Sequence, residues 1–143
     1  MNNNLITYET AKLAKEKGFD QNTYDFWILE DDISSTEDQE FCEHIRKHHS
    51  RLFNWNSRID TYSQPTMSSL QDWLREKHGI VAYVKMVTRI TVHEGTKFQY
   101  DGSIKIIPNN DVIQTDYFPR RTLYNKWNNC LEAVLLEALK LVK

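Results

Sequence analysis

The sequence predicts an α+β fold in which a small antiparallel sheet packs against helices. Three observations carry this prediction. Apolar residues recur at helical spacing in residues 65–79 and in residues 125–142, whereas apolar and polar residues alternate in residues 80–92. From residue 65 onward, the expected order is therefore helix, strand, strand, strand, helix. The 143 residues suffice to bury a core without disulfides or a structural metal, so we expect a single domain over residues 1–143.

The first elements of the chain are expected to be a helix and a strand. Thr7 is a suitable N-cap for the helix, Glu9 lies where it favours the helix dipole, and Gly18 follows the helix end. The aromatic and branched residues 23–29 then predict a strand that stops at an acidic run.

A second helix is predicted over residues 36–49. Thr36 and Gln39 have the spacing of a capping box, and apolar residues follow at helical intervals. The pattern of residues 50–64 fits either a strand or a loop, and both alternatives stay open.

The most clearly defined helix is expected from Pro65, which suits a first-turn position, to Gly79 just beyond the helix end. The alternation in residues 80–92 predicts a long strand with one buried face. The residues expected on that face are Ile80, Ala82, Val84, Met86, Ile90 and Val92.

More strands and a final helix complete the expected fold. Residues 93–96 indicate a turn, and residues 97–107 predict a strand interrupted by a tight turn or bulge at Asp101-Gly102. Residues 112–118 predict a further extended piece. The apolar face expected for the last helix, residues 125–142, consists of Trp127, Leu131, Val134, Leu135, Ala138, Leu139 and Val142.

Charge is distributed unevenly along the chain. The formal net charge is −2, but residues 1–64 carry 7 basic and 12 acidic side chains, whereas residues 65–143 carry 11 and 8. The chain therefore divides into an acidic N-terminal portion and a mildly basic helix–sheet–helix unit. An asymmetry of this kind can mark a basic binding surface, although an excess of three charges is small for that purpose.

The termini and the cysteines indicate an intracellular protein. The N-terminus, Met1 to Asn4, is polar and lacks a signal-peptide core, and charged residues interrupt the apolar stretch near the C-terminus. We therefore expect no contact with a membrane. Cys42 and Cys130 are far apart in the sequence, so reduced thiols are expected.

Motifs for catalysis are lacking in the sequence. Its four glycines form no phosphate-binding loop, and no nucleophile motif is present, so we expect neither an enzyme nor a cofactor. The nearest approach to a metal site is His44 and His48, which would lie at i and i+4 of the predicted helix. Arg46 and Lys47 would repel a cation there. A solvated helix face is therefore the stronger interpretation, and no metal is expected.

Three stretches of the sequence resemble small proteins of unknown function encoded by bacteriophages and prophages. They are ITYETAKLAKEKGF at residues 6–19, PTMSSLQDWLREKHGI at residues 65–80 and LEAVLLEALKLV at residues 131–142. Met67 departs from the family pattern, in which a Gln commonly stands between the Thr and the Ser of the middle stretch. The resemblance implies a viral protein in the cytoplasm of a host cell, and it implies no reaction, cofactor or catalytic residue.

The order of elements from residue 65 is also similar to that of the double-stranded RNA-binding domain. That domain reads RNA through its first helix, a loop between strands and a Lys cluster at the start of its last helix. The last position here offers Arg120, Arg121 and Lys126. Because phosphate contacts dominate nucleic-acid affinity, so few charges would give weak, salt-sensitive binding to RNA or a nucleotide.

Surplus aromatic residues favour a binding function. Trp55 lies between two asparagines and Tyr117-Phe118 lies beside two arginines, and aromatics in such surroundings are typical of interface anchors or base-stacking sites. These aromatics are therefore the ones expected at the surface. The candidate binding residues are Trp55, Tyr117, Phe118, Arg120, Arg121 and Lys126.

The sequence thus predicts a non-enzymatic phage-type accessory protein that binds a host protein. One alternative is a nucleic-acid or nucleotide binder, and a more remote one is a metal-dependent enzyme that uses His44 and His48. An unpaired edge strand in so small a sheet would also suit a homodimer.

Overall fold

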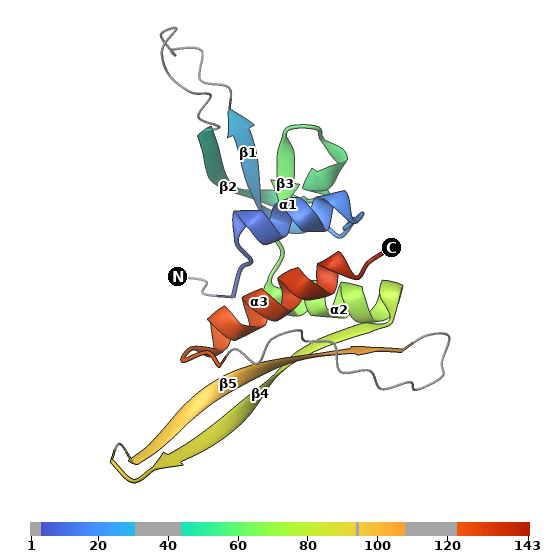
Figure 1. Cartoon of the computed structure of the whole chain (residues 1–143). Helices are drawn as coiled ribbons and strands as arrows, with labels where there is room; N and C mark the ends of the chain where they lie inside the picture. Colours follow the sequence, from blue (N-terminus) through green and yellow to red (C-terminus); the bar gives the residue numbers. More distant parts are fainter. Residues whose placement is uncertain (1–3, 31–43, 94, 108–122) are drawn as a thin grey trace, which may run out of the picture. The chain divides into compact units, whose positions relative to one another are not determined.

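The computed structural model describes residues 4–30, 44–93, 95–107 and 123–143. Its elements form two compact units (Figure 1). The N-terminal unit comprises Thr7–Pro65, and the hairpin unit comprises Met1–Ile6 together with Thr66–Lys143. Each unit combines helical segments with antiparallel strands, so the predicted α+β class is confirmed.

The boundary between the units coincides with the division in charge. It falls at Pro65, and neither Pro65 nor residues 1–6 include a charged side chain. The N-terminal unit therefore holds the 7 basic and 12 acidic side chains of the acidic portion, and the hairpin unit holds the other 11 and 8. A single domain over residues 1–143 stays a prediction.

The N-terminal unit begins with helix α1, Tyr8–Glu16. Thr7 caps the helix, because its side chain accepts a hydrogen bond from the backbone N–H of Thr10. Glu9 lies in the first turn, and Gly18 follows the helix with a φ of 89°, which favours glycine. The predicted first helix is therefore confirmed together with its caps.

A three-stranded antiparallel sheet forms the rest of the N-terminal unit. Strand β1 (Thr23–Glu30) lies between β2 (His44–Phe53) and β3 (Thr61–Ser63). A 3₁₀ turn, Trp55–Ser57, joins β2 to β3. The strand predicted at the position of β1 is confirmed. Residues 50–64, which the sequence left between strand and loop, contain the end of β2, the 3₁₀ turn and β3.

The helix predicted over residues 36–49 is wrong in its described part, because residues 44–49 belong to β2. Residues 36–43 lie outside the described residues. β2 pairs with β1 along its length, for example through Phe26↔His48. Hydrogen bonds to a strand that is distant in sequence outweigh a sparse helical spacing of apolar residues, and a local pattern does not contain them.

The hairpin unit begins its fold with helix α2, Met67–His78. Thr66 is the N-cap and accepts a hydrogen bond from the Ser69 N–H at 3.1 Å. Gly79 ends the helix in the left-handed conformation, with a φ of 64°. The predicted helix is confirmed, but Pro65 lies just before the N-cap and not in the first turn.

Two long strands, β4 (Ile80–Thr91) and β5 (Gly95–Ile106), follow as an antiparallel hairpin. The turn predicted at residues 93–96 is confirmed at the end of this hairpin, where Gly95 has a φ of 73°. The turn or bulge predicted at Asp101-Gly102 is wrong, because both residues lie within β5. Asp101 lies opposite Lys85, and such an opposite-charge pair stabilises the continuous ladder.

The extended piece predicted at residues 112–118 lies outside the described residues. The next described segment pairs with β5 at one position. Tyr124 donates its backbone N–H to the Tyr100 carbonyl at 2.9 Å, and Tyr100 donates to the Tyr124 carbonyl at 2.8 Å. The final helix, α3 (Trp127–Lys140), begins three residues later.

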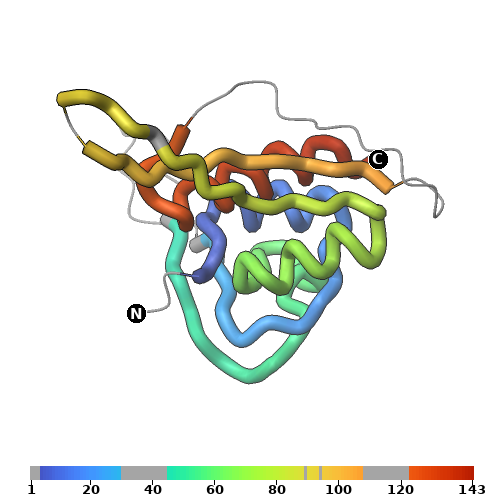
Figure 2. The backbone as a smooth tube through the Cα atoms, turned by 90° about the horizontal axis from the view of Figure 1, so that it is seen from below, coloured from blue at the N-terminus to red at the C-terminus, as the bar shows by residue number. Residues whose placement is uncertain are grey.

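Helices α2 and α3 pack on one face of the hairpin and form the core of this unit (Figures 1 and 2). The buried core residues of α2, β4 and β5 are Met67, Leu70, Trp73, Leu74, Ile80, Ala82 and Ile104. Those of α3 and the residues after it are Cys130, Leu131, Val134, Leu135, Ala138, Leu139 and Val142. The predicted apolar face of the last helix is confirmed except at Trp127, which is 43% exposed.

The helices cover only part of the hairpin. The 14 residues of α3 span about 21 Å, whereas the 12 residues of β4 span about 40 Å. The hairpin turn consequently extends past both helices (Figures 1 and 2). We call Ile80–Lys85 with Asp101–Ile106 the near half of the hairpin, and Met86–Thr91 with Gly95–Tyr100 the distal half.

Candidate binding surface

One side of the distal half carries exposed apolar side chains. Successive strand residues point to opposite faces, so the even-numbered residues of both strands share the face that is buried in the near half. Met86 is 62% exposed, Ile90 81% and Phe98 58%. We define the distal face by these three residues together with Thr88, Thr96 and Tyr100, which pair across the two strands.

The alternating pattern predicts that the β4 residues of this face are buried, and for the distal half that prediction is wrong. Ile80 and Ala82 are buried, whereas Met86, Ile90 and also Val92 at the turn are exposed. The alternation identifies the face correctly, but the helices end before they can cover it. The signal available in the sequence was physical length, because the alternating run of residues 80–92 spans about 44 Å as a strand, whereas the helical run of residues 125–142 spans about 27 Å as a helix.

The distal face carries no charged side chain, whereas the opposite face of the hairpin is basic. The charged residues with described side chains that the register places on that opposite face are Lys85, Lys97, Asp101 and Lys105. Among these, basic residues exceed acidic ones by two. The hairpin is amphipathic, with an apolar side and a positively charged side.

Tyr83 lies among these basic residues. The ammonium groups of Lys85 and Lys105 lie 5.5 Å and 5.4 Å from the centre of its ring. Burial raises the pKa of Tyr83, but hydrogen bonds with Lys105 and Ser103 and the charges of both lysines outweigh burial, so its pKa lies below the ordinary value. The local field of this face therefore favours negative charge.

The outer edge of β4 is the third feature of the surface. The Ile107 N–H donates to the Gly79 carbonyl at 2.7 Å, which continues the β4–β5 ladder and places odd-numbered β4 residues in hydrogen-bonded pairs. Even-numbered residues then direct their N–H and C=O groups outward. Two observations agree with this assignment: the side chain of Gln71 donates to the outward Ala82 carbonyl at 2.8 Å, and Tyr100 bonds outward to Tyr124.

Trp55, predicted at the surface, is buried at 6% exposure, and that expectation is wrong. Its indole N–H donates to the Thr23 carbonyl at 2.9 Å, and its ring stacks on Phe26 with ring centres 3.8 Å apart. The polar neighbours Asn54 and Asn56 suggested exposure, but the 3₁₀ turn directs the indole into the N-terminal unit.

The remaining candidate residues are distributed over two parts of the chain. Tyr117, Phe118, Arg120 and Arg121 lie outside the described residues. Lys126 is exposed and occupies the N-cap position of α3. It therefore stays a candidate for contact with a negatively charged partner.

His44 and His48 cannot act as neighbouring metal ligands in the way the predicted helix implied. Both belong to β2, where residues four apart are separated by about 13 Å along the strand. The His48 ring stacks on Phe26, with ring centres 5.5 Å apart. Within the described ranges, no group of three or more His, Cys, Asp and Glu residues is placed to hold a metal ion.

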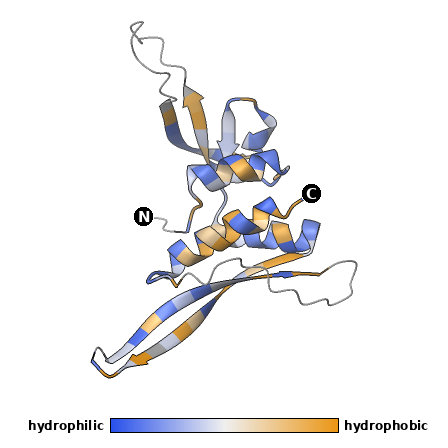
Figure 3. Ribbon diagram, viewed as in Figure 1, coloured by the Kyte–Doolittle hydropathy of each residue, from blue (hydrophilic) through white to orange (hydrophobic). Residues whose placement is uncertain are grey.

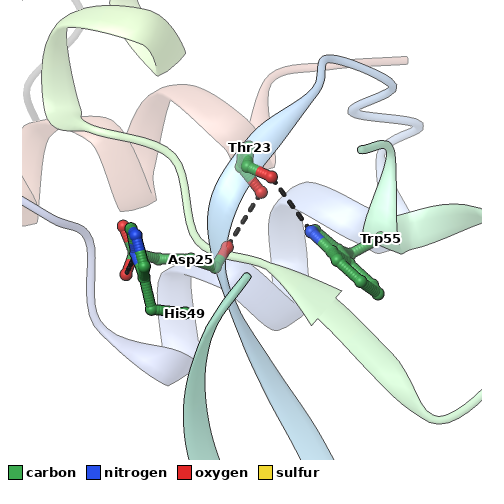
Figure 4. A network of polar contacts seen from close by, with 4 residues as sticks. All are labelled: Thr23, Asp25, His49 and Trp55. Atoms are coloured by element: carbon green, nitrogen blue, oxygen red, sulfur yellow. Dashed lines mark hydrogen bonds and ion pairs between the residues drawn. The ribbon is translucent and has the colours of Figure 1, made fainter. Parts of the chain in front are cut away.

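A polar contact between strands β1 and β2 joins Asp25 and His49 in the N-terminal unit (Figure 4). His49 Nδ1 lies 2.9 Å from a carboxylate oxygen of Asp25, and the Thr23 hydroxyl donates to the Asp25 backbone carbonyl at 2.8 Å. The imidazole is largely exposed, and exposed ion pairs contribute little to stability. These contacts link β1 to β2 and order the start of β1, where the Thr23 carbonyl accepts the hydrogen bond from the Trp55 indole.

Cys130 is a core residue of the hairpin unit. It is fully buried in α3, and burial, with a smaller effect from Asp101, raises the pKa of its thiol to about 11. A neutral buried thiol is a poor nucleophile. Cys130 therefore contributes packing to the hairpin unit.

Comparison with models of known protein families, with curated proteins and with solved structures finds no match for this chain. The similarities to phage proteins and to the double-stranded RNA-binding domain therefore stay predictions. Among the helices of the described segments, none is both long enough and apolar enough to cross a membrane.

Proposed function

We propose that this protein is a non-enzymatic binding module that recognises another protein through the distal face of its hairpin. The observation that carries the proposal is the exposure of Met86, Ile90 and Phe98 on one uncharged face. Exposed apolar side chains that gather on one surface mark protein interaction sites more often than scattered ones do. Apolar segments of the distal half are visible in Figure 3.

The energetics of the hairpin favour an occupant for this face. Two strands without a covering layer are marginally stable in water, and three or more strands or a packed helix are usually needed. Burying a large apolar side chain completely contributes about 1.5–3 kcal/mol. Met86, Ile90 and Phe98 expose more than half of their surface, so covering them would contribute about 1–2 kcal/mol each.

The proposed partner is a host protein, and the proposed place of action is the cytoplasm of the host cell. Support for a viral accessory role comes from the resemblance of residues 6–19, 65–80 and 131–142 to phage proteins. A small uncharged face is suited to a protein surface, because nucleic acid would require charge on the contacting side.

The test compares three forms of the full chain. The double variant Ile90→Ser/Phe98→Ser removes most of the exposed apolar surface, and Ile59→Ser is the matched control, since Ile59 is an exposed isoleucine of the N-terminal unit. A partner is captured by photocrosslinking from a benzoylphenylalanine at position 98, identified by mass spectrometry and purified. We expect the double variant to bind it more than about tenfold more weakly, and the control to bind it like the unmodified chain.

Three results would overturn the proposal. Equal affinity of the double variant and the control would show that the distal face is not the binding surface. Capture that disappears on nuclease treatment would instead support the nucleic-acid alternative, with Lys126 and the basic face of the hairpin as its contacts. A crosslink only to a second copy would identify self-association. Circular dichroism checks that the double variant is folded.

A further inference from the structure

We infer that the partner contributes an extended segment that adds to the outer edge of β4 from Val84 to Ile90, with apolar and acidic residues in alternation. This inference rests on the proposed function, because it names the chemistry of the partner that covers the distal face. The observation behind it is that an edge of β4 with which no described segment pairs lies between the apolar distal face and the basic face of the hairpin.

The open edge follows from the hydrogen bonds of the hairpin. Val84, Met86, Thr88 and Ile90 are even-numbered, so their N–H and C=O groups point away from β5. At the near end, the Gln71 side chain satisfies the outward carbonyl of Ala82. Beyond that point, no other described segment supplies a hydrogen bond to the edge, whereas the opposite edge of the hairpin is met by Tyr124.

An edge of this kind is a template for a further strand. Main-chain hydrogen bonds of an added strand give affinity, and alternate side chains give specificity. A strand beside Val84 to Ile90 would extend the sheet and place every second side chain next to Met86 and Ile90 of the distal face. Those side chains should be apolar, because Met86 and Ile90 are exposed and uncharged.

The intervening side chains of the added strand would lie on the basic face. There they would adjoin Lys85, on a face where the described basic side chains exceed the acidic ones by two. Opposite charges on neighbouring strands stabilise a sheet, whereas like charges destabilise it. Glutamate or aspartate therefore suits these positions.

The same rule disfavours a second copy of this chain as the occupant. If two β4 strands paired antiparallel along this edge, the basic face of one copy, which carries Lys85, Lys97 and Lys105, would continue into the basic face of the other. Like charges on neighbouring strands destabilise such a sheet. A partner with acidic residues avoids this repulsion.

The experiment uses synthetic peptides as probes and the full chain as receptor, with fluorescence anisotropy as the readout. The first peptide alternates valine with glutamate and is as long as the open edge. One control has the same composition with the valines grouped, and another replaces glutamate with lysine. We expect the alternating acidic peptide to bind at least about tenfold more tightly than either control, and Lys85→Glu to reduce that preference.

Two modifications test the strand pairing itself. Thr88→Pro removes an outward N–H without removing a hydrogen bond to β5, and Thr88→Ala is the matched control that keeps the N–H. We expect Thr88→Pro to weaken peptide binding about tenfold and Thr88→Ala to leave it nearly unchanged. Two peptides, each methylated on one of the two alternating sets of backbone nitrogens, give an independent measurement on the unmodified protein. Only the peptide whose hydrogen-bonding nitrogens are unmethylated should bind.

The outcomes separate this inference from the proposed function. If Ile90→Ser/Phe98→Ser abolishes binding of the purified partner while Thr88→Pro and backbone methylation have no effect, the partner covers the face without adding a strand, and the inference is overturned. If none of these changes has an effect, both proposals fail. Sedimentation that shows a dimer dissociated by Thr88→Pro would make a second copy the occupant and would also overturn the inference.

Discussion

The two halves of the hairpin have the same alternating pattern and different surroundings. In the near half, Ile80, Ala82 and Ile104 are buried beneath α2 and α3, whereas in the distal half Met86, Ile90 and Phe98 lie on the same face in solvent. The difference arises from length, because each helix spans about half of the strand it covers. Alternation identifies a face, and the neighbouring elements decide whether that face is core or binding surface.

The largest effect that would test this comparison is expected from Ile104→Ala, set against Ile90→Ala. Ile104 is buried at 1% exposure, so its truncation should lower the free energy of unfolding by about 2–5 kcal/mol. Ile90→Ala should change it by less than about 0.5 kcal/mol, because Ile90 is exposed. Urea unfolding followed by tryptophan fluorescence measures both, and equal losses would contradict the division into halves.

A second comparison uses the glycines at the two ends of the hairpin, Gly79 before β4 and Gly95 at the start of β5. Gly79 and Gly95 both have positive φ, which costs an L-residue about 1–2 kcal/mol. A Cβ at Gly79 would also collide with the Ile107 carbonyl, whereas a Cβ at Gly95 would meet no atom within 4 Å. We therefore expect Gly79→Ala to lower the melting temperature clearly more than Gly95→Ala. The reverse order would show that the distal turn is the more constrained end.

The smallest expected effect is a pH dependence confined to the covered half. The folded state holds the proton of Cys130 up to about pH 11, whereas the unfolded chain releases it at the ordinary pKa of 9.0. The stabilisation is therefore complete below about pH 9 and is lost as the pH rises through about 11. The free energy of unfolding, measured from pH 8 upward, should decline less steeply in the Cys130→Ala variant than in the unmodified chain. Parallel profiles would contradict the raised pKa.

Local signals predicted those elements whose determinants lie within a few residues. Thr7 and Gly18 bound α1, and Gly79 ends α2, because caps act on the adjoining turn. The same locality explains the errors. The β2 residues spaced like a helix pair with a strand more than ten residues away in sequence, and Asp101-Gly102, a turn dipeptide, is held extended by β4.

The candidate site was predicted only in part. The sequence indicated a binding role and an unpaired edge strand, but it placed Trp55 at the surface and Met86 and Ile90 in the core. Both errors concern burial. Burial depends on which side chains approach from elsewhere in the chain, and neighbouring residues along the sequence carry little information about that.

By itself, the sequence determined the α+β class, the caps of the first helix, the glycine that ends the second, the change of charge at Pro65 and the two faces of the long strand. The tertiary structure decided which part of each face is covered, that residues 44–49 form a strand, and that no described segment pairs with the edge of β4 from Val84 to Ile90. The physical reason is that backbone conformation responds to nearby residues, whereas burial and strand pairing require partners that only folding brings together.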